Sequence, residues 1–211
     1  MLDLLPVPDE ATVLDLGAGT GKLTRVLAAR YARVIALEPL SELRVILAAR
    51  VPDAEALDGV AERIPLNDQE VDAVFAGQSF HWFANDTALR EIGRVLRPGG
   101  VLALLWNRAL DPLPLPPAYA ARIDELHNER RPALPEENVL QRSGLFGDET
   151  EDFVDHEQVS DRDDVLALAA SVSWIASRED REDVLAELAA LLPEAEYRFT
   201  MRTELTWAIR L

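Results

Sequence analysis

The feature that most constrains the fold is an alternation of short apolar runs with helical patterns in the first half of the chain. Five apolar runs favour β-strands: 12–16, 33–37, 54–57, 71–76 and 101–106. Three segments between them place apolar residues three and four positions apart, as in amphipathic helices: 22–30, 41–50 and 87–96. Strands that alternate with helices indicate a parallel sheet, and uniformly apolar strands indicate cover on both faces. The sequence therefore predicts an α/β fold with a doubly wound sheet.

The second half of the chain has a different pattern. The third helix is expected to end at 97–100, where a proline and two glycines turn the chain, and the proline-rich residues 111–117 predict an extended connector. The elements expected beyond it are a helix near 118–129, a polar loop to about Gly147, strands over 150–159 and 197–209, and two helices that open at Asp161 and Ser177, the second ending at Pro193.

Charge and composition limit the partners of this protein. The chain has 38 acidic and 21 basic residues, a formal net charge of −17 at pH 7. Such a surface repels phosphate backbones and no basic patch interrupts it, so no nucleic-acid partner is expected. No apolar run approaches the roughly 20 residues of a membrane span, and the start does not resemble a signal peptide, so no membrane partner is expected. Without cysteine, disulfides and thiolate metal ligands are excluded. We expect a cytoplasmic protein.

A glycine-rich turn joins the first expected strand to the first expected helix. Gly17, Gly19 and Gly21 let the backbone bend tightly and let a ligand approach it, and the helix start beyond offers free amide donors. The spacing differs from the Gly-x-Gly-x-x-Gly of dinucleotide sites. Asp15, two residues before Gly17, disfavours a pyrophosphate and favours a ligand with an ammonium group. The local chemistry therefore favours S-adenosylmethionine over NAD; a turn without a ligand is the alternative.

Glu38 directly follows the second expected strand. In a doubly wound sheet a carboxylate at this place can accept hydrogen bonds from both ribose hydroxyls of a nucleoside ligand. Taken alone, Glu38 would be read as an exposed residue at a strand end. Combined with the glycine turn one helix and one strand earlier, ribose binding is the favoured interpretation.

Four segments in order resemble the successive motifs of class I S-adenosylmethionine-dependent methyltransferases: 15–21, 36–39, 58–66 and 94–100. The likeness is to the small-molecule group that includes ubiquinone-biosynthesis and trans-aconitate methyltransferases. Residues 76–83 and 104–108 further resemble an uncharacterised, largely actinobacterial subgroup. The resemblance is strong over roughly 11–108 and weaker beyond.

This resemblance implies a Rossmann-like sheet of seven strands whose last strand is antiparallel, with 150–159 and 197–209 as the final pair. It implies a single methyltransferase domain over 1–211, with a cofactor-binding half (1–110) and a helical and final-strand half (111–211). Relatives have a longer segment before the first strand, which covers cofactor and substrate. Only residues 1–11 precede that strand here, so the cover is expected to be missing and the pocket open.

The resemblance also implies the cofactor-binding residues. The methionine end would be lined by Asp15, Gly17, Ala18, Gly19 and Gly21. The ribose would be held by Glu38 with Pro39, the adenine would be bordered by Ala61 and Glu62, and Gln78 would lie beside the cofactor. Many relatives have an acidic residue where Val60 stands, which weakens the expected adenine contact.

His81 is the candidate general base, because it follows the fourth strand where the carboxyl edge of the sheet faces the ligand. A histidine that packs on Trp82 and Phe83 and shapes the pocket is the favoured alternative. His127 and His156 lack the spacing of metal ligands, and no metal is expected. Arg108 suits an anionic acceptor or a plain surface ion pair.

The leading hypothesis is methyl transfer from S-adenosylmethionine to a small-molecule acceptor. A catalytically idle or regulatory S-adenosylmethionine-binding protein is the alternative, motivated by the missing cover. A nicotinamide-dependent oxidoreductase is disfavoured by the glycine spacing. The acceptor stays open, as does a homodimer that would bury an uncovered apolar edge.

Overall fold

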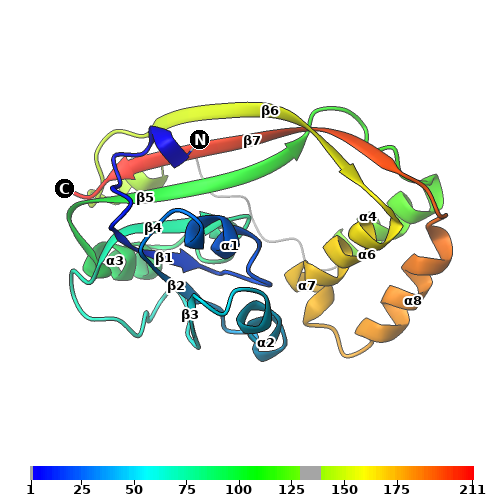
Figure 1. The fold of residues 1–211 in the computed structure, drawn as a ribbon, viewed down its shortest axis with the longest axis horizontal. Coiled ribbons are helices and arrows are strands. Elements are labelled where there is room, and N and C mark those ends of the chain that lie inside the picture. The colour runs from blue at the N-terminus through cyan, green and yellow to red at the C-terminus, as the bar shows by residue number, and fades with distance from the viewer. Residues whose placement is uncertain (1, 129–138) are drawn as a thin grey trace. The chain divides into compact units, whose positions relative to one another are not determined.

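The computed structural model describes residues 2–128 and 139–211. Within these residues the chain forms a seven-stranded sheet with the order β3-β2-β1-β4-β5-β7-β6 (Figure 1). Strands β1 to β5 are parallel, whereas β7 is antiparallel to both β5 and β6. The strands are β1 (Thr12–Leu16), β2 (Arg33–Leu37), β3 (Glu55–Leu57), β4 (Val71–Gly77), β5 (Leu96–Ala109), β6 (Thr150–Ser160) and β7 (Tyr197–Ile209). The predicted Rossmann-like fold with an antiparallel last strand is confirmed.

Helices connect these strands. They are η1 (Leu2–Leu4), α1 (Lys22–Ala28), α2 (Ser41–Arg50), η2 (Phe80–Trp82), α3 (Asp86–Val95), α4 (Pro117–Asn128), α5 (Val139–Arg142), α6 (Arg162–Ser171), α7 (Ser173–Ala176) and α8 (Arg181–Leu191). None of the described helices is long and apolar enough to cross a bilayer.

The chain does turn at 97–100, where four residues of β5 face the single Asp72 of β4 and Gly99 has a φ of +79°. The helix ends there as expected, but β5 already begins at Leu96 and includes Pro98, Gly99 and Gly100. The backbone of this stretch pairs with Arg210, which directly follows β7: Gly99 N–H donates to the Arg210 carbonyl at 3.2 Å, and Arg210 N–H donates to the Gly100 carbonyl at 2.8 Å. A register shift in the β4–β5 pairing marks an irregularity, the setting in which a sheet tolerates proline.

Two expectations for the second half also need correction. The helix predicted to open at Ser177 begins at Arg181 as α8, after the short α7 and a turn. Asp180 is the N-cap residue of α8, and the Arg178 guanidinium in the turn donates to the Asp180 carboxylate at 2.6 Å. The polar loop predicted to reach Gly147 contains α5, while its residues 129–138 lie outside the described part of the chain. The helix expected to open at Asp161 is confirmed as α6, with a capping box between Asp161 and Asp164.

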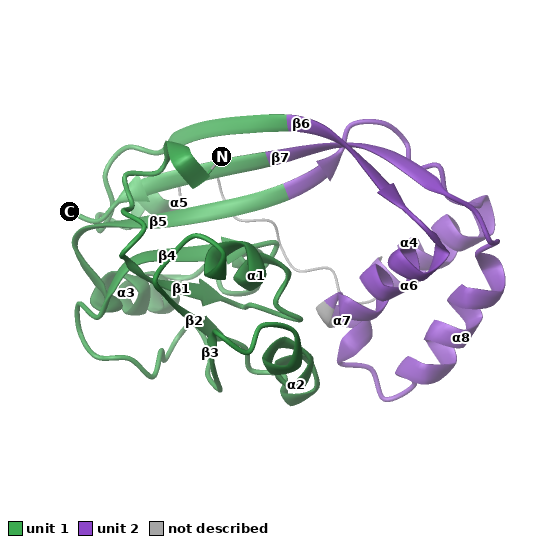
Figure 2. Cartoon of the chain, in the orientation of Figure 1, with its two compact units in different colours: residues 1–106, 133–154, 204–211 green, residues 107–132, 155–203 purple. Residues whose placement is uncertain are grey.

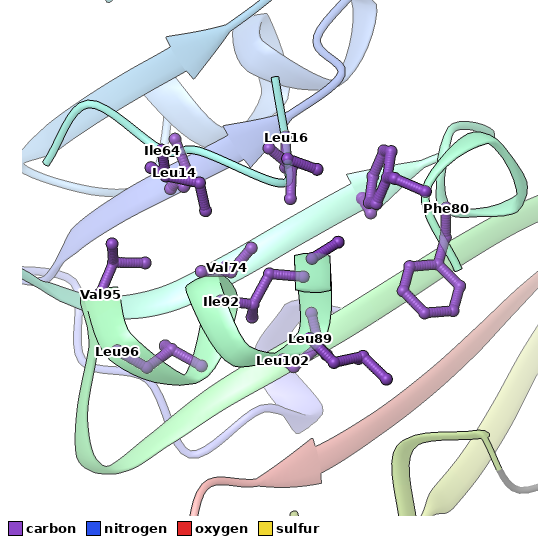
Figure 3. Close-up of a cluster of buried hydrophobic side chains, with 14 of the residues drawn as sticks. Leu14, Leu16, Ile64, Val74, Phe80, Leu89, Ile92, Val95, Leu96 and Leu102 are labelled. Carbon is purple, nitrogen blue, oxygen red and sulfur yellow. The ribbon is translucent and has the colours of Figure 1, made fainter. Parts of the chain in front are cut away.

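Side chains of the parallel strands alternate between two faces. On one face Leu14 of β1 and Val74 of β4 pack in one cluster with Ile92 of α3 (Figure 3). On the other face Val13 of β1 packs in a cluster with Leu27 of α1. The strands are therefore covered on both sides, which explains why their sequences read as continuous apolar runs.

The chain divides into two compact units (Figure 2). The first comprises 1–106, 133–154 and 204–211, and the second comprises 107–132 and 155–203. The second unit has its own apolar core, in which Tyr119 of α4, Val165 of α6, Leu188 of α8 and Phe199 of β7 are buried. Every residue proposed above to bind the cofactor lies in the first unit.

Candidate functional site

The glycine turn after β1 has a left-handed backbone at each of its three glycines. The φ angles are +72° at Gly17, +57° at Gly19 and +83° at Gly21, values that disfavour any residue with a side chain. The backbone N–H groups of Gly17 and Ala18 both donate to the Leu37 carbonyl, at 2.9 and 3.1 Å. The turn is thereby fixed against the carboxyl end of β2.

The surroundings of these glycines differ. A Cβ on Gly17 would lie 2.8 Å from the Cβ of Ser79, and one on Gly21 would lie 3.2 to 3.3 Å from side chains of Val51 and Leu47. A Cβ on Gly19 would meet nothing within 4 Å. Gly17 and Gly21 therefore permit close packing, while Gly19 presents its backbone to open space, where a ligand can approach.

Glu38 is in direct contact with this turn. One carboxylate oxygen accepts from Gly19 N–H at 2.8 Å, the other accepts from Leu40 N–H at 2.9 Å, and the side chain is 5% exposed. Arg44 of α2 supports the same corner by donating to the carbonyls of Glu38 and Pro39 at 2.6 and 3.2 Å. A carboxylate oxygen can accept more than one hydrogen bond, so each Glu38 oxygen keeps acceptor capacity beyond these backbone contacts.

Asp15 lies beneath the turn and is 1% exposed. Its carboxylate accepts a 2.6 Å hydrogen bond from the hydroxyl of Thr24, a buried residue of α1. Burial raises the pKa of Asp15 from 3.8 to about 7 and the negative charge of Glu38 adds to the rise, while the Thr24 hydrogen bond opposes it. Thr24 did not emerge from the sequence analysis; the signal was a polar residue on the buried face of the first helix.

The segment after β3 lies beside the end of β2. Glu38 N–H donates to the Leu57 carbonyl at 3.1 Å, and a Cβ on Gly59 would approach a methyl of Leu37 to 2.9 Å. Ala61 is buried, and Glu62 accepts a 2.9 Å hydrogen bond from Asn85, the N-cap of α3. Ala61 thus packs in the same apolar cluster as Leu37 at the end of β2, whereas Glu62 contacts the start of α3.

The chain after β4 is strained and tightly held. Gln78 has a φ of +58°, which is unfavourable for a residue with a side chain by about 1–2 kcal/mol. Its N–H donates to the Leu105 carbonyl at 2.9 Å, and the hydroxyl of buried Ser79 donates to the Leu16 carbonyl at 2.7 Å. Strain of this kind is common at functional sites. Ser79, which the sequence analysis missed, ties the end of β4 to the end of β1.

His81 belongs to an aromatic group in the first unit. Its ring centroid lies 5.3 Å from that of Trp82 and 5.4 Å from that of Trp106. Phe83 instead packs edge-to-face on Phe80, with centroids 5.6 Å apart.

The other histidines lie elsewhere. His127 stacks on Trp174 in the second unit, with centroids 5.5 Å apart, and His156 is part of β6. Among the residues described, no group of three or more His, Asp or Glu side chains could hold a metal ion. Arg108 belongs to the second unit.

The arrangement fits S-adenosylmethionine. The carboxyl ends of β1 and β2 bring together the buried carboxylate of Asp15, the carboxylate of Glu38 and the open backbone position of Gly19. In such a site Asp15 would suit an ammonium group and Glu38 would suit ribose hydroxyls. Ligands of open α/β sheets bind at this edge.

Comparison with known proteins agrees with this geometry. Residues 14–104 match the family model described as a methyltransferase domain. An uncharacterised methyltransferase of Schizosaccharomyces pombe is 47% identical over 106 residues, which are 50% of this chain and 42% of the relative. The chain thus spans less than half the length of that curated relative.

Solved structures share the fold. The YcgJ protein of Bacillus subtilis has a TM-score of 0.64 at 16% identity, covering 100% of this chain and 96% of that one. Geranyl diphosphate C-methyltransferase of Streptomyces coelicolor, solved with Mg²⁺, geranyl diphosphate and S-adenosyl-L-homocysteine, has a TM-score of 0.58 at 15% identity, covering 100% and 76%. The chain is thus similar to methyltransferases over residues 14–104, and it shares its fold with a methyltransferase solved with S-adenosyl-L-homocysteine.

Proposed function

We propose that this chain transfers a methyl group from S-adenosylmethionine to a small-molecule acceptor. The observation that carries the proposal is the hydrogen bond from Gly19 N–H to Glu38, formed beside the buried Asp15 within the segment that matches a methyltransferase domain. On one ligand, Glu38 suits the ribose hydroxyls and Asp15 suits an ammonium group. Gly19 between them leaves room for the ligand to approach. The resemblance of 76–83 and 104–108 supports placing the chain in the largely actinobacterial subgroup.

The binding roles follow the order of the strands. Asp15 and the turn from Gly17 through Ala18 and Gly19 to Gly21 hold the methionine end. Glu38 holds the ribose, and Pro39 continues its corner.

The adenine and the methyl group of the cofactor are assigned to the residues that follow β3 and β4. Ala61 and Glu62 border the adenine. Gln78 lies beside the cofactor, and its strained backbone is the support for that role.

When bound, the cofactor supplies a methyl group on a sulfonium, which is already activated for displacement. The protein then contributes alignment and exclusion of water. His81 lies near Trp82 and Trp106. When the methyl acceptor is a hydroxyl group, His81 acts as the general base and takes the proton of that hydroxyl. A carboxylate acceptor needs no base, and His81 then shapes the pocket.

The small-molecule acceptor is supported by charge. The net charge of −17 opposes nucleic-acid acceptors. The Gly-x-Gly-x-Gly spacing of the turn disfavours a dinucleotide, whose sites have Gly-x-Gly-x-x-Gly, and a charged Asp15 two residues before Gly17 would repel a pyrophosphate.

The test is a thermal-shift titration with S-adenosylhomocysteine, with NADH as the control. A hundredfold excess over Kd adds about 2.7 kcal/mol to the free energy of unfolding, which raises Tm by roughly 5–10 °C for a chain of this size. A rise with NADH alone would overturn the proposal. Binding followed by transfer of labelled methyl to a pool of small acids, phenols and amines would establish the activity; binding without transfer would favour an idle or regulatory protein.

A further inference from the structure

Arg44, near the start of α2, bonds to the backbone at the end of β2. Its Nη1 atom donates to the Glu38 carbonyl at 2.6 Å and to the Pro39 carbonyl at 3.2 Å. The same atom donates to a carboxylate oxygen of Asp58 at 3.2 Å. Glu38 directly follows β2 and Asp58 directly follows β3. Because these strands are parallel, the acceptors of Arg44 lie at the carboxyl edge of the sheet, where the candidate site is.

The bond to Pro39 fixes the direction of the next backbone amide. The Pro39 carbonyl and the Leu40 N–H belong to one planar peptide unit and point in opposite directions. Arg44 holds the carbonyl side of this unit. On the other side, Leu40 N–H donates to a Glu38 carboxylate oxygen at 2.9 Å. The guanidinium therefore acts on the Glu38 side chain through one rigid group of atoms.

The corner around Glu38 has further supports. Gly19 N–H donates to the second carboxylate oxygen at 2.8 Å. The Glu38 N–H donates to the Leu57 carbonyl at 3.1 Å, which ties the backbone of the corner to β3. The ring of Pro39 fixes φ but leaves ψ free, and ψ sets the direction of the Pro39 carbonyl. The bond from Arg44 to that carbonyl restrains this angle.

We infer that Arg44 is a positioning residue, which aligns the Glu38 carboxylate for the ribose hydroxyls and thereby sets the preference for a ribose over a deoxyribose ligand. The inference rests on the proposed function. Arg44 bonds to the corner, so it affects the ligand through Glu38. A hydrogen bond weakens steeply when its angle is poor, so a carboxylate that is free to tilt binds a hydroxyl less well.

The experiment compares two ligands that differ by one hydroxyl group. S-adenosylhomocysteine has the 2′-hydroxyl of the ribose, and its 2′-deoxy analogue lacks it. Both are titrated by calorimetry into wild type and Arg44→Met, below the Tm of each protein. Methionine keeps an unbranched apolar side chain and has no hydrogen-bond donor.

Wild type should prefer S-adenosylhomocysteine by about tenfold or more, which is the value of a hydrogen bond to a charged group. In Arg44→Met this preference should fall by about three- to tenfold, because a misaligned carboxylate loses much of that bond. Most of the fall should come from weaker binding of S-adenosylhomocysteine.

Arg33→Met is the matched control. Arg33 is the first residue of β2 and donates to Glu55, the first residue of β3, at 2.8 Å, and to Glu70 at 3.4 Å. The control thus removes an arginine that joins the same two strands at the opposite edge of the sheet. It should keep the wild-type preference.

A double-mutant cycle with Glu38→Gln tests whether Arg44 acts through Glu38. Glu38→Gln alone should lose most of the preference for S-adenosylhomocysteine. In that background Arg44→Met should change the preference little further, because the group that Arg44 aligns is already altered. If Arg44→Met lowered the preference by the same factor with and without Glu38, the positioning role would be wrong.

Hydrogen exchange provides a readout without ligand. The Leu40 amide should exchange faster in Arg44→Met than in wild type or Arg33→Met, while the amide of Ile35, in the middle of β2 between β1 and β3, keeps its rate. Should Arg44→Met fold poorly, Arg44→Lys keeps a charge on a shorter side chain. Its preference should lie between those of wild type and Arg44→Met.

The outcomes separate this inference from the proposed function. Wild type that binds neither ligand would overturn the proposed function. Wild type that binds both ligands equally well would overturn the ribose role of Glu38, and the positioning role with it. Wild type that prefers S-adenosylhomocysteine, with the same preference in Arg44→Met and Arg44→Lys, would overturn the positioning role alone.

Discussion

The hydroxyl of Thr24 donates a hydrogen bond to the Asp15 carboxylate at 2.6 Å where both side chains are buried. The bond favours the charged form of Asp15, yet burial outweighs it and the pKa rises to about 7. An acidic group is thus kept close to its titration point at neutral pH, beneath a turn that is open towards a ligand.

Asp15→Asn should stabilise the protein above neutral pH. Because the folded pKa of about 7 exceeds the unfolded value of 3.8, the stability that Asp15 contributes is complete below pH 3.8 and is lost as pH rises through about 7. At about 1.4 kcal/mol per pKa unit, the loss is at most about 4 kcal/mol. Urea unfolding of wild type and Asp15→Asn between pH 4 and 8 measures it.

The difference in unfolding free energy between those two proteins should grow from pH 4 to about 7 and then level off. The exposed Asp53→Asn is the control and should show no such growth. A difference that is constant with pH would contradict the raised pKa.

Affinity for S-adenosylhomocysteine should increase with pH through about 7. The ammonium of the ligand favours charged Asp15, so binding below pH 7 must displace a proton. Each pH unit below 7 should cost up to about tenfold in affinity. Calorimetry at pH 6, 7 and 8 measures this, and Asp15→Asn should give a flatter profile; stronger binding at pH 6 than at pH 8 would count against the role of Asp15.

The parallel half of the fold could be predicted from the sequence because each signal is local. The runs at 12–16 and 33–37 are β1 and β2 with the same boundaries. The turn predicted at 97–100 is present, but its pairing with Arg210, more than a hundred residues later, was not predicted and makes it the first part of β5. The proline and the two glycines predict the turn, but they carry no sign of that long-range partner.

The candidate site was only partly visible in the sequence. Asp15, Gly19 and Glu38 stand in a recognisable motif, but their supports Thr24 and Ser79 do not. Thr24 and Ser79 act through contacts that exist only once β1, α1 and β4 are packed: one with the Asp15 carboxylate and one with the Leu16 carbonyl. Supporting residues of this kind depend on tertiary distance, which residue spacing does not encode.

Alanine at Gly17 and Gly19 should have different effects. Both glycines have a left-handed φ, but a Cβ on Gly17 would lie 2.8 Å from Ser79 and a Cβ on Gly19 would meet nothing within 4 Å. Gly17→Ala should lower the free energy of unfolding by about 2–4 kcal/mol, and Gly19→Ala by about 1–2 kcal/mol. Chemical unfolding of the two variants checks the order.

Gly19→Ala should nevertheless bind S-adenosylhomocysteine at least tenfold more weakly while folded, because its new methyl group enters the open space beside the turn. Equal destabilisation by the two substitutions, or wild-type binding by Gly19→Ala, would contradict this assignment.

Glu38→Gln should weaken cofactor binding more than it weakens the fold. The two Glu38 oxygens accept from Gly19 N–H and Leu40 N–H, whereas a glutamine offers one oxygen and one donor, so one backbone N–H loses its acceptor. The free energy of unfolding should fall by about 1–3 kcal/mol.

Affinity of Glu38→Gln for S-adenosylhomocysteine should fall about 10- to 100-fold, since the ribose hydroxyls lose a charged acceptor as well. Calorimetry at a temperature where the variant is folded measures this, with the exposed Glu10→Gln as the matched control. Adenosine should lose affinity by a similar factor, because it has the same ribose and lacks the methionine end. If adenosine bound both proteins equally well, Glu38 would hold the glycine turn without contacting the ribose.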